Sequence, residues 1–354
     1  MTRQKNNILI LLFLMCFGLA IRLYNLDLYP QHVDEIFTMD LIHKPLLEVV
    51  AFGLSQDCNP PLFYIVDWFS VHLLGFTNFA QRLPAVTFGV LAIPAAYLLG
   101  KELRDETLGM ISAAVITIAG TMWYYSQFGR GYTMVIFLFI MALVFYIRLL
   151  RNDTSTRTWW CYGLLASACV WTHLYALVPL GLMALYLLYL YRTQAIKPLV
   201  LTHAPIAVLL GTFYAIASQR QNIMQGWMGN TVPQLLQYFT LEYFGYTAIL
   251  VIVLIGISLW FNKQDKVIPV LFCVWLLSFV AQLVISTITP VFVRYTLLMV
   301  PMLYVIALEP ANRFIQNEDS TPAQKAFILF LFAGMFVAIT AYQVYSGMYV
   351  DRQL

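Results

Sequence analysis

Long apolar segments separated by short polar breaks run through almost the whole chain. A bilayer core takes about 20 apolar residues per helical crossing, and about twelve segments approach that length. They lie at about 7–26, 62–78, 83–100, 108–128, 132–150, 159–174, 176–191, 198–217, 244–261, 267–288, 295–309 and 326–346. A backbone in lipid must satisfy its own hydrogen bonds, so each segment predicts a helix. We expect an all-α polytopic membrane protein with one transmembrane domain, residues 1–354.

Lysine and arginine collect in cytoplasmic connections, so their positions predict the orientation of the helices. Strict alternation of all the segments puts pairs such as Lys101 and Arg104 outside, against this rule. If residues 60–100 cross the membrane an odd number of times overall, 13 of the 20 lysines and arginines lie on the cytoplasmic side. The simplest way to obtain an odd number is for 62–78, which contains Asp67 and His72, to lie partly in the membrane interface and not span the bilayer. The pattern then predicts about eleven crossings, a cytoplasmic N-terminus and an external C-terminus.

Composition narrows the class of protein further. Of the 354 residues, 61% are hydrophobic and 10% are charged, which no water-soluble core requires. The net charge of +3 is spread over many loops without a basic run, so no nucleic acid is expected as a partner. The five cysteines have no CxxC spacing and indicate neither zinc nor a redox pair. The first apolar segment lacks a small-residue cleavage site and is expected to stay as a membrane helix.

This topology places most of the unusual polar residues on the external face. The first external loop, 27–60, should carry short amphipathic helices and holds six acids against Lys44 alone. The acids are Asp27, Asp34, Glu35, Asp40, Glu48 and Asp57. The same side holds Arg82, the Gly129–Tyr132 turn, His173 with Tyr175, and Arg294 with Tyr295. Acids and arginines are therefore expected to face each other.

Transfer of a sugar from a polyprenyl phosphate needs this combination of groups. A carboxylate takes the proton from the attacking hydroxyl, and cations hold the departing phosphate. Asp34 or Glu35 supplies the carboxylate. Arg82, Arg130 and Arg294 are the candidate phosphate ligands, because a guanidinium stays charged and binds phosphate oxygens in pairs. The lipid tail of the donor would lie between the helices.

Each of these features also has an ordinary structural explanation. Adjacent acids in an external loop can simply be solvated, and arginines at helix ends can extend to the headgroups. His173 can be a hydrogen-bonded interfacial residue, and Asn59-Pro60-Pro61 can mark the start of a helix. The many tryptophans and tyrosines first indicate an interfacial aromatic belt.

The order of the motifs resembles the family 39 glycosyltransferases of the GT-C fold, which include the protein O-mannosyltransferases. Coverage is good from Ile21 to Pro179 and thin beyond. The stretches that carry the resemblance are Val33-Asp34-Glu35-Ile36, Asn59-Pro60-Pro61-Leu62-Phe63-Tyr64, Gln81-Arg82-Leu83-Pro84-Ala85-Val86, Tyr125-Ser126-Gln127-Phe128-Gly129-Arg130-Gly131-Tyr132, Trp171-Thr172-His173-Leu174-Tyr175-Ala176-Leu177 and Phe292-Val293-Arg294-Tyr295.

The resemblance implies an inverting transfer of a mannose-like hexose by direct displacement. Asp34 is then the general base, and Glu35 beside it orients the acceptor or the donor. Arg82 and Arg130 bind phosphate or support the site. The same motifs imply substrate binding by Asn59, Pro60, Tyr132, His173, Tyr175 and Tyr295.

The sequence departs from the family at two positions. The His-Pro-Pro of the family reads Asn59-Pro60-Pro61, and the usual Glu-Ala before the arginine reads Phe128-Gly129. Any role of the family's histidine, including metal binding, is therefore open. His32, Asp34, His43 and Asp57 could ligate a metal but have no recognisable metal spacing. We expect no metal and no other cofactor to be required.

Three other classes of protein remain. A transporter would place ionisable residues near the bilayer midplane and often shows repeated halves. A lipid-linked glycan flippase or polymerase would use a similar substrate, and a scaffold could share the fold without catalysis. Residues 218–243 are long for a connection and are expected to form a lid or a plain external connector. We expect a prokaryotic plasma membrane location and a lipid, glycan or protein acceptor.

Overall fold

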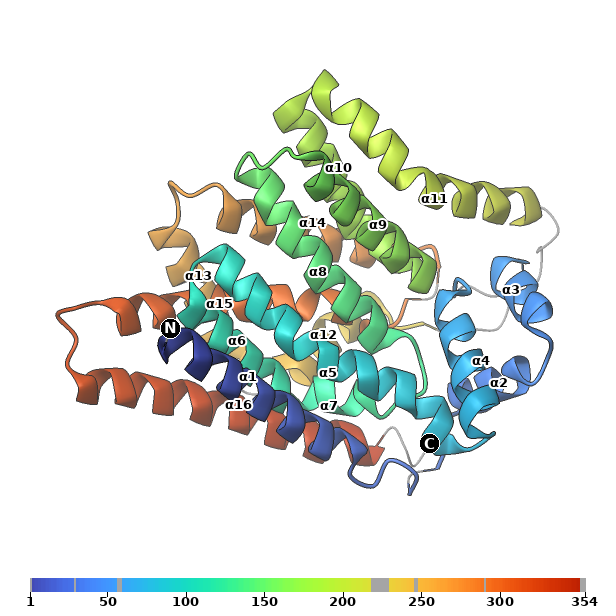
Figure 1. Ribbon diagram of the computed structural model, residues 1–354, viewed down its shortest axis with the longest axis horizontal. Coiled ribbons are helices and arrows are strands. Elements are labelled where there is room, and N and C mark those ends of the chain that lie inside the picture. Colours follow the sequence, from blue (N-terminus) through green and yellow to red (C-terminus); the bar gives the residue numbers. More distant parts are fainter. Residues whose placement is uncertain are drawn as a thin grey trace.

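The computed structural model describes residues 2–28, 30–55, 59–217, 229–244, 248–289 and 291–350, and every regular element within them is a helix (Figure 1). The first half of the chain forms α1 (Thr2–Leu23), α2 (Val33–Ile42), α3 (Leu46–Ser55), α4 (Leu62–Leu74), α5 (Asn78–Leu103), α6 (Glu106–Ile118), α7 (Gly120–Ser126) and α8 (Tyr132–Leu150). The second half forms α9 (Thr156–Thr172), η1 (Leu174–Ala176), α10 (Leu177–Tyr191), α11 (Thr193–Ala217), α12 (Val232–Phe244), α13 (Ala248–Phe261), α14 (Val267–Ile285), η3 (Val293–Met299), α15 (Val300–Gln316) and α16 (Pro322–Val350).

Eight helices in the described residues are long and apolar enough to cross a membrane, or nine if the bent pair α6 and α7 counts as one span. The sequence predicted about eleven or twelve, and the difference arises because several apolar segments form shorter helices. Among these, α4 has 13 residues, which at 1.5 Å per residue gives about 20 Å against a hydrocarbon core of about 30 Å. This length is in keeping with the interfacial placement expected for 62–78. The protein is therefore an all-α, multi-pass membrane protein.

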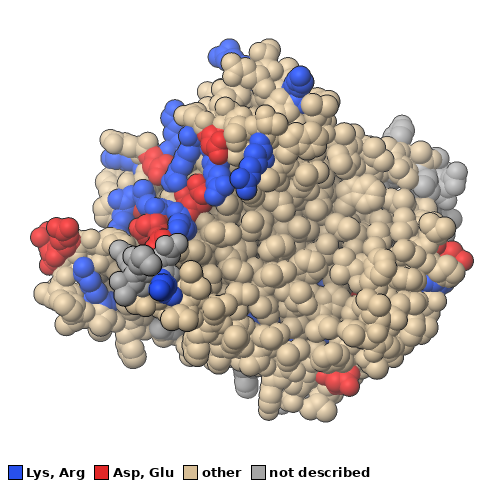
Figure 2. Space-filling view, in the orientation of Figure 1, with Lys and Arg blue, Asp and Glu red and all other residues tan. Residues whose placement is uncertain are grey.

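The bundle has two polar ends, which we call the α2–α4 end and the opposite end. Figure 1 shows α2, α3 and α4 together at one end of the bundle, and the α5–α6, α13–α14 and α15–α16 connections at the other. Figure 2 shows lysine, arginine and acidic side chains clustered at the opposite end, with a wide uncharged surface beside them. Between the ends, α1 and α16 expose large apolar side chains such as Phe13 and Phe330, as a lipid-facing surface requires.

Helix α5 is the centre of the packing, and it lies between α6 and α8. Two glycines allow its backbone to approach that of α6. A Cβ on Gly100 would lie 2.7 Å from the Leu108 carbonyl oxygen, and one on Gly109 would lie 2.5 Å from that of Tyr97. Larger side chains at either position would push the helices apart. The close contact fixes α5, whose second turn carries Arg82.

The bend between α6 and α7 is stabilised by Arg22 of α1. The two helices meet at 56°, so the last carbonyls of α6 cannot all be used within a helix. Arg22 donates to the carbonyl oxygens of Ile116 (3.0 Å) and Thr117 (3.1 Å), and its Nε donates to Ser126 Oγ of α7 (3.1 Å). It is completely buried. Its side chain joins α1, α6 and α7 inside the protein.

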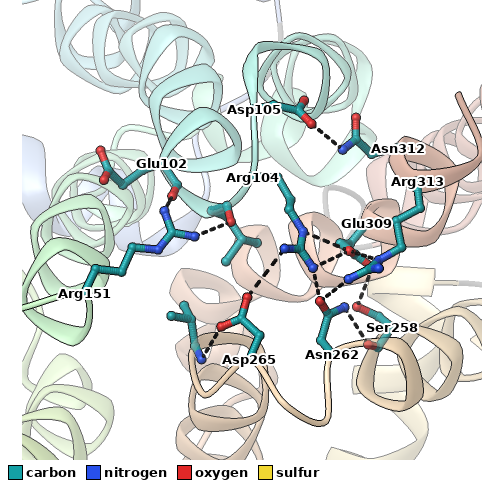
Figure 3. Close-up of polar contacts among 12 residues, drawn as sticks. Glu102, Arg104, Asp105, Arg151, Ser258, Asn262, Asp265, Glu309, Asn312 and Arg313 are labelled. Carbon is teal, nitrogen blue, oxygen red and sulfur yellow. Dashed lines mark hydrogen bonds and ion pairs between the residues drawn. The ribbon is translucent and has the colours of Figure 1, made fainter. Parts of the chain in front are cut away.

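A second buried network joins α5 to α15 at the opposite end (Figure 3). Glu309 of α15 has no exposed side-chain surface and pairs with Arg104 at 2.9 Å and with Arg313. Arg104 follows directly after α5 and also lies 3.6 Å from Asp265. Nearby, Asn312 of α15 donates to Asp105, the residue that caps α6 (2.9 Å). Because η3 leads directly into α15, this network holds one end of the segment that carries Arg294.

Candidate functional site

Two adjacent acids begin α2, and the local sequence explains their position. His32 is the N-cap, and its Nδ1 accepts from the Asp34 amide (3.1 Å). In return, Glu35 Oε2 accepts from the His32 amide (3.0 Å), which completes a capping box. Successive residues of a helix point about 100° apart. The two carboxylates therefore point into different surroundings. The sequence alone did not show which of the two is buried.

Glu35 lies in a buried ion pair with Arg82. Arg82 Nε donates to Oε1 (2.8 Å) and Nη2 to Oε2 (3.0 Å), while the Gly129 amide also donates to Oε1 (2.7 Å). Arg82 also donates to carbonyl oxygens of the chain before α2, those of Leu26 (2.7 Å) and Pro30 (3.1 Å). Both residues are 1% exposed. The pair joins α2, α5 and the α7–α8 turn and leaves little of either side chain for a ligand.

Asp34 is the more open of the two acids. Its side chain is 12% exposed, and Oδ2 lies 3.3 Å from Arg294 Nη2 and 3.8 Å from His32 Nδ1. Asp34 and Arg294 are 260 residues apart in the sequence. The structure therefore brings together an acid and an arginine that the sequence predicted to face each other.

Arg294 also has a hydrogen-bond donor that is not used. Its Nε is buried and has no hydrogen-bond partner among the described residues. The guanidinium carbon lies 4.4 Å from the centre of the Phe292 ring, which holds the side chain over η3. A buried donor without an acceptor is costly, so this position suits an anionic ligand.

Arg130 lies in the α7–α8 turn and is largely buried. Its Nη1 donates to Thr38 Oγ1 of α2 (2.8 Å) and to the Tyr64 hydroxyl of α4 (3.2 Å). The guanidinium carbon also lies 5.6 Å from the centre of the Tyr64 ring. Arg130 thus positions α4 against α2, beside Asp34.

The aromatic residues of the site come from three separate motifs. His173 lies between Tyr132 and Tyr295, with ring centres 5.8 Å and 5.0 Å away, and Tyr175 lies 4.5 Å from Tyr295. His173 is 5% exposed, and neither ring nitrogen has a hydrogen-bond partner among the described residues. The alternative explanation of His173 as a hydrogen-bonded interfacial residue therefore has no support in this part of the structure.

A small cavity brings together several of the sequence-predicted site residues. It is lined by Asn59, Pro60, Phe63, Tyr64, Arg130, Gly131, Tyr132, Thr172 and His173. Five of these were candidates from the sequence. Asp34 and Arg294 do not line it, so the candidate site has two neighbouring parts, the cavity and the Asp34–Arg294 pair. Arg82 belongs to neither part.

Asp67 of α4 is a polar residue of this region whose role the sequence did not reveal. Its carboxyl group is fully buried, and neither oxygen has a hydrogen-bond partner among the described residues. Burial raises the pKa of Asp67 well above its usual range, although the charge of Arg130 opposes this shift. A lone acid within an apolar helix was the available signal, because such residues often belong to functional sites.

No group of three or more His, Cys, Asp or Glu residues that could hold a metal ion occurs in the described residues. Of the four side chains considered as ligands, His32 and Asp34 lie together, whereas His43 stacks on Phe76 with ring centres 4.1 Å apart. Asp57 lies outside the described residues, as do residues 218–228 of the segment 218–243. The described part of that segment approaches the site, since Asn230 Oδ1 accepts from the Val293 amide beside Arg294 (3.1 Å).

No protein-family model and no curated protein matches the sequence. Solved structures do resemble it. ArnT from Cupriavidus metallidurans in the apo state has a TM-score of 0.61 and 15% identity, over 96% of this chain and 75% of that one. An ArnT structure with undecaprenyl phosphate has a TM-score of 0.63, 14% identity and the same coverage.

An archaeal protein gives a similar result. AglB, the oligosaccharyltransferase of Archaeoglobus fulgidus, in complex with an inhibitory peptide and a dolichol-phosphate, has a TM-score of 0.62 and 11% identity. The match covers 99% of this chain and 56% of that one, so this chain spans little more than half the length of AglB. Together these neighbours show that the chain has the GT-C fold expected from its motifs.

Proposed function

We propose that this protein is a membrane glycosyltransferase that transfers a sugar from a polyprenyl-phosphate donor to an acceptor hydroxyl, with inversion at the anomeric carbon. The observation that carries the proposal is the contact between the partly open Asp34 carboxylate and Arg294, whose buried Nε lacks a partner. A proton acceptor and a phosphate ligand thus lie side by side at one polar end of a membrane protein.

In the proposed reaction, Asp34 accepts the proton of the acceptor hydroxyl while that oxygen bonds to the anomeric carbon of the sugar. The bond between this carbon and the phosphate oxygen breaks, and polyprenyl phosphate leaves with the electron pair. Arg294 offers Nε and its fork to the phosphate, and the charge of Arg130 lies close by. The proton then passes from Asp34 to solvent. Because the displacement is direct, no covalent enzyme intermediate is needed, and because arginines hold the phosphate, no metal is needed.

Glu35 and Arg82 have a different role in this proposal. Their pair is buried and saturated with internal hydrogen bonds, so we assign both as positioning residues that hold the start of α2. The small cavity beside Arg130 is the proposed sugar-binding part of the site. There Asn59, Tyr132 and His173 present polar groups, and Pro60 and the rings of Tyr175 and Tyr295 form or adjoin its apolar wall.

The lipid character of the donor rests on the neighbours and on the fold. ArnT has been solved with undecaprenyl phosphate and AglB with dolichol-phosphate, and one AglB structure carries a tethered acceptor peptide. By analogy, the polyprenyl chain lies between helices of this protein. The family 39 motifs support a mannose-like hexose as the sugar. The acceptor class is a lipid, a glycan or a protein.

The proposed orientation is supported by the distribution of charge. Basic residues gather at the opposite end of the bundle, away from α2–α4 (Figure 2). Because such residues collect on the cytoplasmic side, we place the candidate site on the external face of a prokaryotic plasma membrane. Residues 218–243 would then lie outside, as a lid over the site or as a plain connector.

The test is sugar transfer by membranes that carry the wild type or Asp34→Asn, with a panel of radiolabelled polyprenyl-phosphate sugars. Asparagine keeps the shape of the side chain and removes the proton acceptor, so we expect turnover to be lost while insertion is unchanged. The matched control is Asp40→Asn, an exposed acid of the same helix, which should retain activity.

The outcomes separate the alternatives. Turnover by the wild type and the control alone would establish the reaction class and support Asp34 as the base. Equal turnover by Asp34→Asn would overturn the assignment of the base. Absence of turnover with every donor would favour a flippase or a scaffold.

A further inference from the structure

A second and larger cavity lies far from the candidate site, where α9 begins and α10 ends. It has an empty volume of about 950 Å³ including the open mouth, and residues of the α8–α9 connection, α9, α10 and α11 line it. Its walls include the indoles of Trp159 and Trp160 and the phenol of Tyr191, and its polar groups include Gln194 and Lys197. Neither the motifs nor the proposed reaction uses any of these residues.

The cavity lies next to a point of close contact between α9 and α11. A Cβ on Gly163 of α9 would lie 2.1 Å from Thr202 of α11, so the helices touch there. Beyond this point Ser167 donates to the Thr202 carbonyl (3.1 Å), and Trp171 donates to that of Pro205 (2.9 Å). On the other side of the Gly163 contact, the cavity lies between the first turns of α9 and of α11.

Tyr191 forms part of the cavity wall and is itself held by contacts with α8 and α9. Its hydroxyl donates to the Leu149 carbonyl at the end of α8 and lies 3.2 Å from Asn152 Oδ1. The Tyr191 and Trp159 rings contact each other with centres 6.1 Å apart. The walls are therefore fixed by contacts on both sides.

The charge of this cavity is uncompensated. Lys197 is exposed and has no ion-pair or hydrogen-bond partner in the described structure, and no acid lines the cavity. At the same end of the bundle Lys101 and Arg148 each pair with a glutamate. Gln194 and the exposed Trp160 add donors that likewise have no partner within the described residues. Figure 2 shows basic side chains without acidic neighbours over the α10–α11 connection.

The apolar wall continues out of the cavity along both helices. Leu201 of α11 is 50% exposed, and Leu164 of α9, one turn from Trp160, is 52% exposed. A soluble anion would have no use for this surface, whereas the acyl chains of a lipid would cover it. Indoles and a lysine at the polar end of membrane helices also match the depth of lipid headgroups.

We propose that this cavity binds the phosphate-containing headgroup of an anionic membrane phospholipid, with Lys197 as the cationic contact and Leu164 and Leu201 against the acyl chains. The site is separate from the proposed donor site, at the other polar end of the bundle. In the proposed orientation it faces the cytoplasmic leaflet, where anionic lipids attract basic groups.

The test is a titration of the purified full-length protein with phosphatidylglycerol or phosphatidylcholine, followed by native mass spectrometry. We expect Lys197→Gln to weaken phosphatidylglycerol binding about tenfold, the effect of losing one charge-assisted hydrogen bond. Gln194→Glu, which places a carboxylate of the same size in the cavity, should weaken it at least as much. The matched control is Lys266→Gln, an exposed lysine of the same end that does not line the cavity.

The proposal predicts that phosphatidylglycerol binds more tightly than phosphatidylcholine and that glycerol 3-phosphate does not displace it. Equal losses in Lys197→Gln and Lys266→Gln would overturn the site. Equal binding of both lipids would overturn the selection for negative charge, and displacement by glycerol 3-phosphate would identify a soluble anion as the ligand. Sugar transfer enters none of these readouts, so failure of the proposed function would leave the result intact.

Discussion

Replacement of Glu35 by glutamine tests the division of roles between the two adjacent acids. Each oxygen of Glu35 accepts two hydrogen bonds: Oε1 from Arg82 Nε and the Gly129 amide, and Oε2 from Arg82 Nη2 and the His32 amide. An amide has only one oxygen, so in either orientation its NH₂ group meets two donors. The guanidinium of Arg82 also loses its counter-charge while it stays buried.

Breaking a buried ion pair from one side costs about 3–5 kcal/mol, because the remaining charge is uncompensated. This is a large part of the roughly 5–15 kcal/mol by which folded proteins are stable. We therefore expect Glu35→Gln to lower the thermal unfolding midpoint of the detergent-purified protein strongly. Asp34→Asn, whose side chain is partly exposed, should unfold close to the wild type and lose transfer instead.

The assay is intrinsic tryptophan fluorescence during heating, together with transfer activity below the unfolding midpoint. Glu48→Gln is the control, since this glutamate is exposed and such substitutions change stability by about 0.5 kcal/mol or less. A Glu35→Gln protein that unfolds like the wild type but has no transfer activity would refute the positioning role. Glu35 would then be the chemical group.

Three further predictions concern other charged residues. Arg294→Lys keeps the charge but removes the Nε donor and the planar fork. The kcat/KM for the sugar donor should therefore fall roughly 10- to 100-fold, the effect of one charge-assisted hydrogen bond. An unchanged kcat/KM would exclude Arg294 from phosphate binding. Glu309→Gln removes the acid shared by Arg104 and Arg313. The loss of unfolding free energy should be about 1–3 kcal/mol, because both arginines are partly exposed and Arg104 keeps Asp265, whereas Glu318→Gln in the α15–α16 connection should cost little. Burial raises the pKa of Asp67, so this group favours the folded state below the ordinary carboxyl pKa of about 4, and its contribution is lost as the pH rises through the raised value. Wild-type stability should therefore fall with rising pH more steeply than that of Asp67→Asn, and parallel profiles would contradict a buried neutral carboxyl group.

The sequence predicted the membrane helices because hydropathy acts locally, and each apolar segment had to form its own hydrogen bonds. Details that depend on distant partners were less accessible. The bend at Ala119 interrupts a segment that looked continuous from 108 to 128, and it depends on Arg22, about 95 residues earlier in the chain. From its neighbours alone, Arg22 is an arginine near the end of an apolar segment, and no local pattern links it to that bend.

The candidate site shows the same limit. The motifs identified Asp34, Glu35, Arg82, Arg130 and Arg294 as one group, and the structure places all five at the same end of the bundle. No pattern in the sequence shows that Glu35 pairs with Arg82 and Asp34 with Arg294, because these choices follow from side-chain directions in the folded protein. Asp67 and Thr38 have no motif of their own and entered the site only through their contacts with, or closeness to, Arg130.

Ion pairs at the two ends of the bundle join α5 to the η3–α15 segment, directly at one end and through α2 at the other. Helix α5 has Arg82 near one end and Arg104 just past the other, while the η3–α15 segment has Arg294 near one end and Glu309 near the other. Arg104 and Glu309 attach to each other, and Arg82 and Arg294 attach to neighbouring residues of α2. By helical rise, Arg294 and Glu309 lie roughly 25 Å apart. A shift of α15 along its axis would therefore change the distance between Asp34 and Arg294, so the charges at one end of the bundle help to set the geometry of the site at the other end.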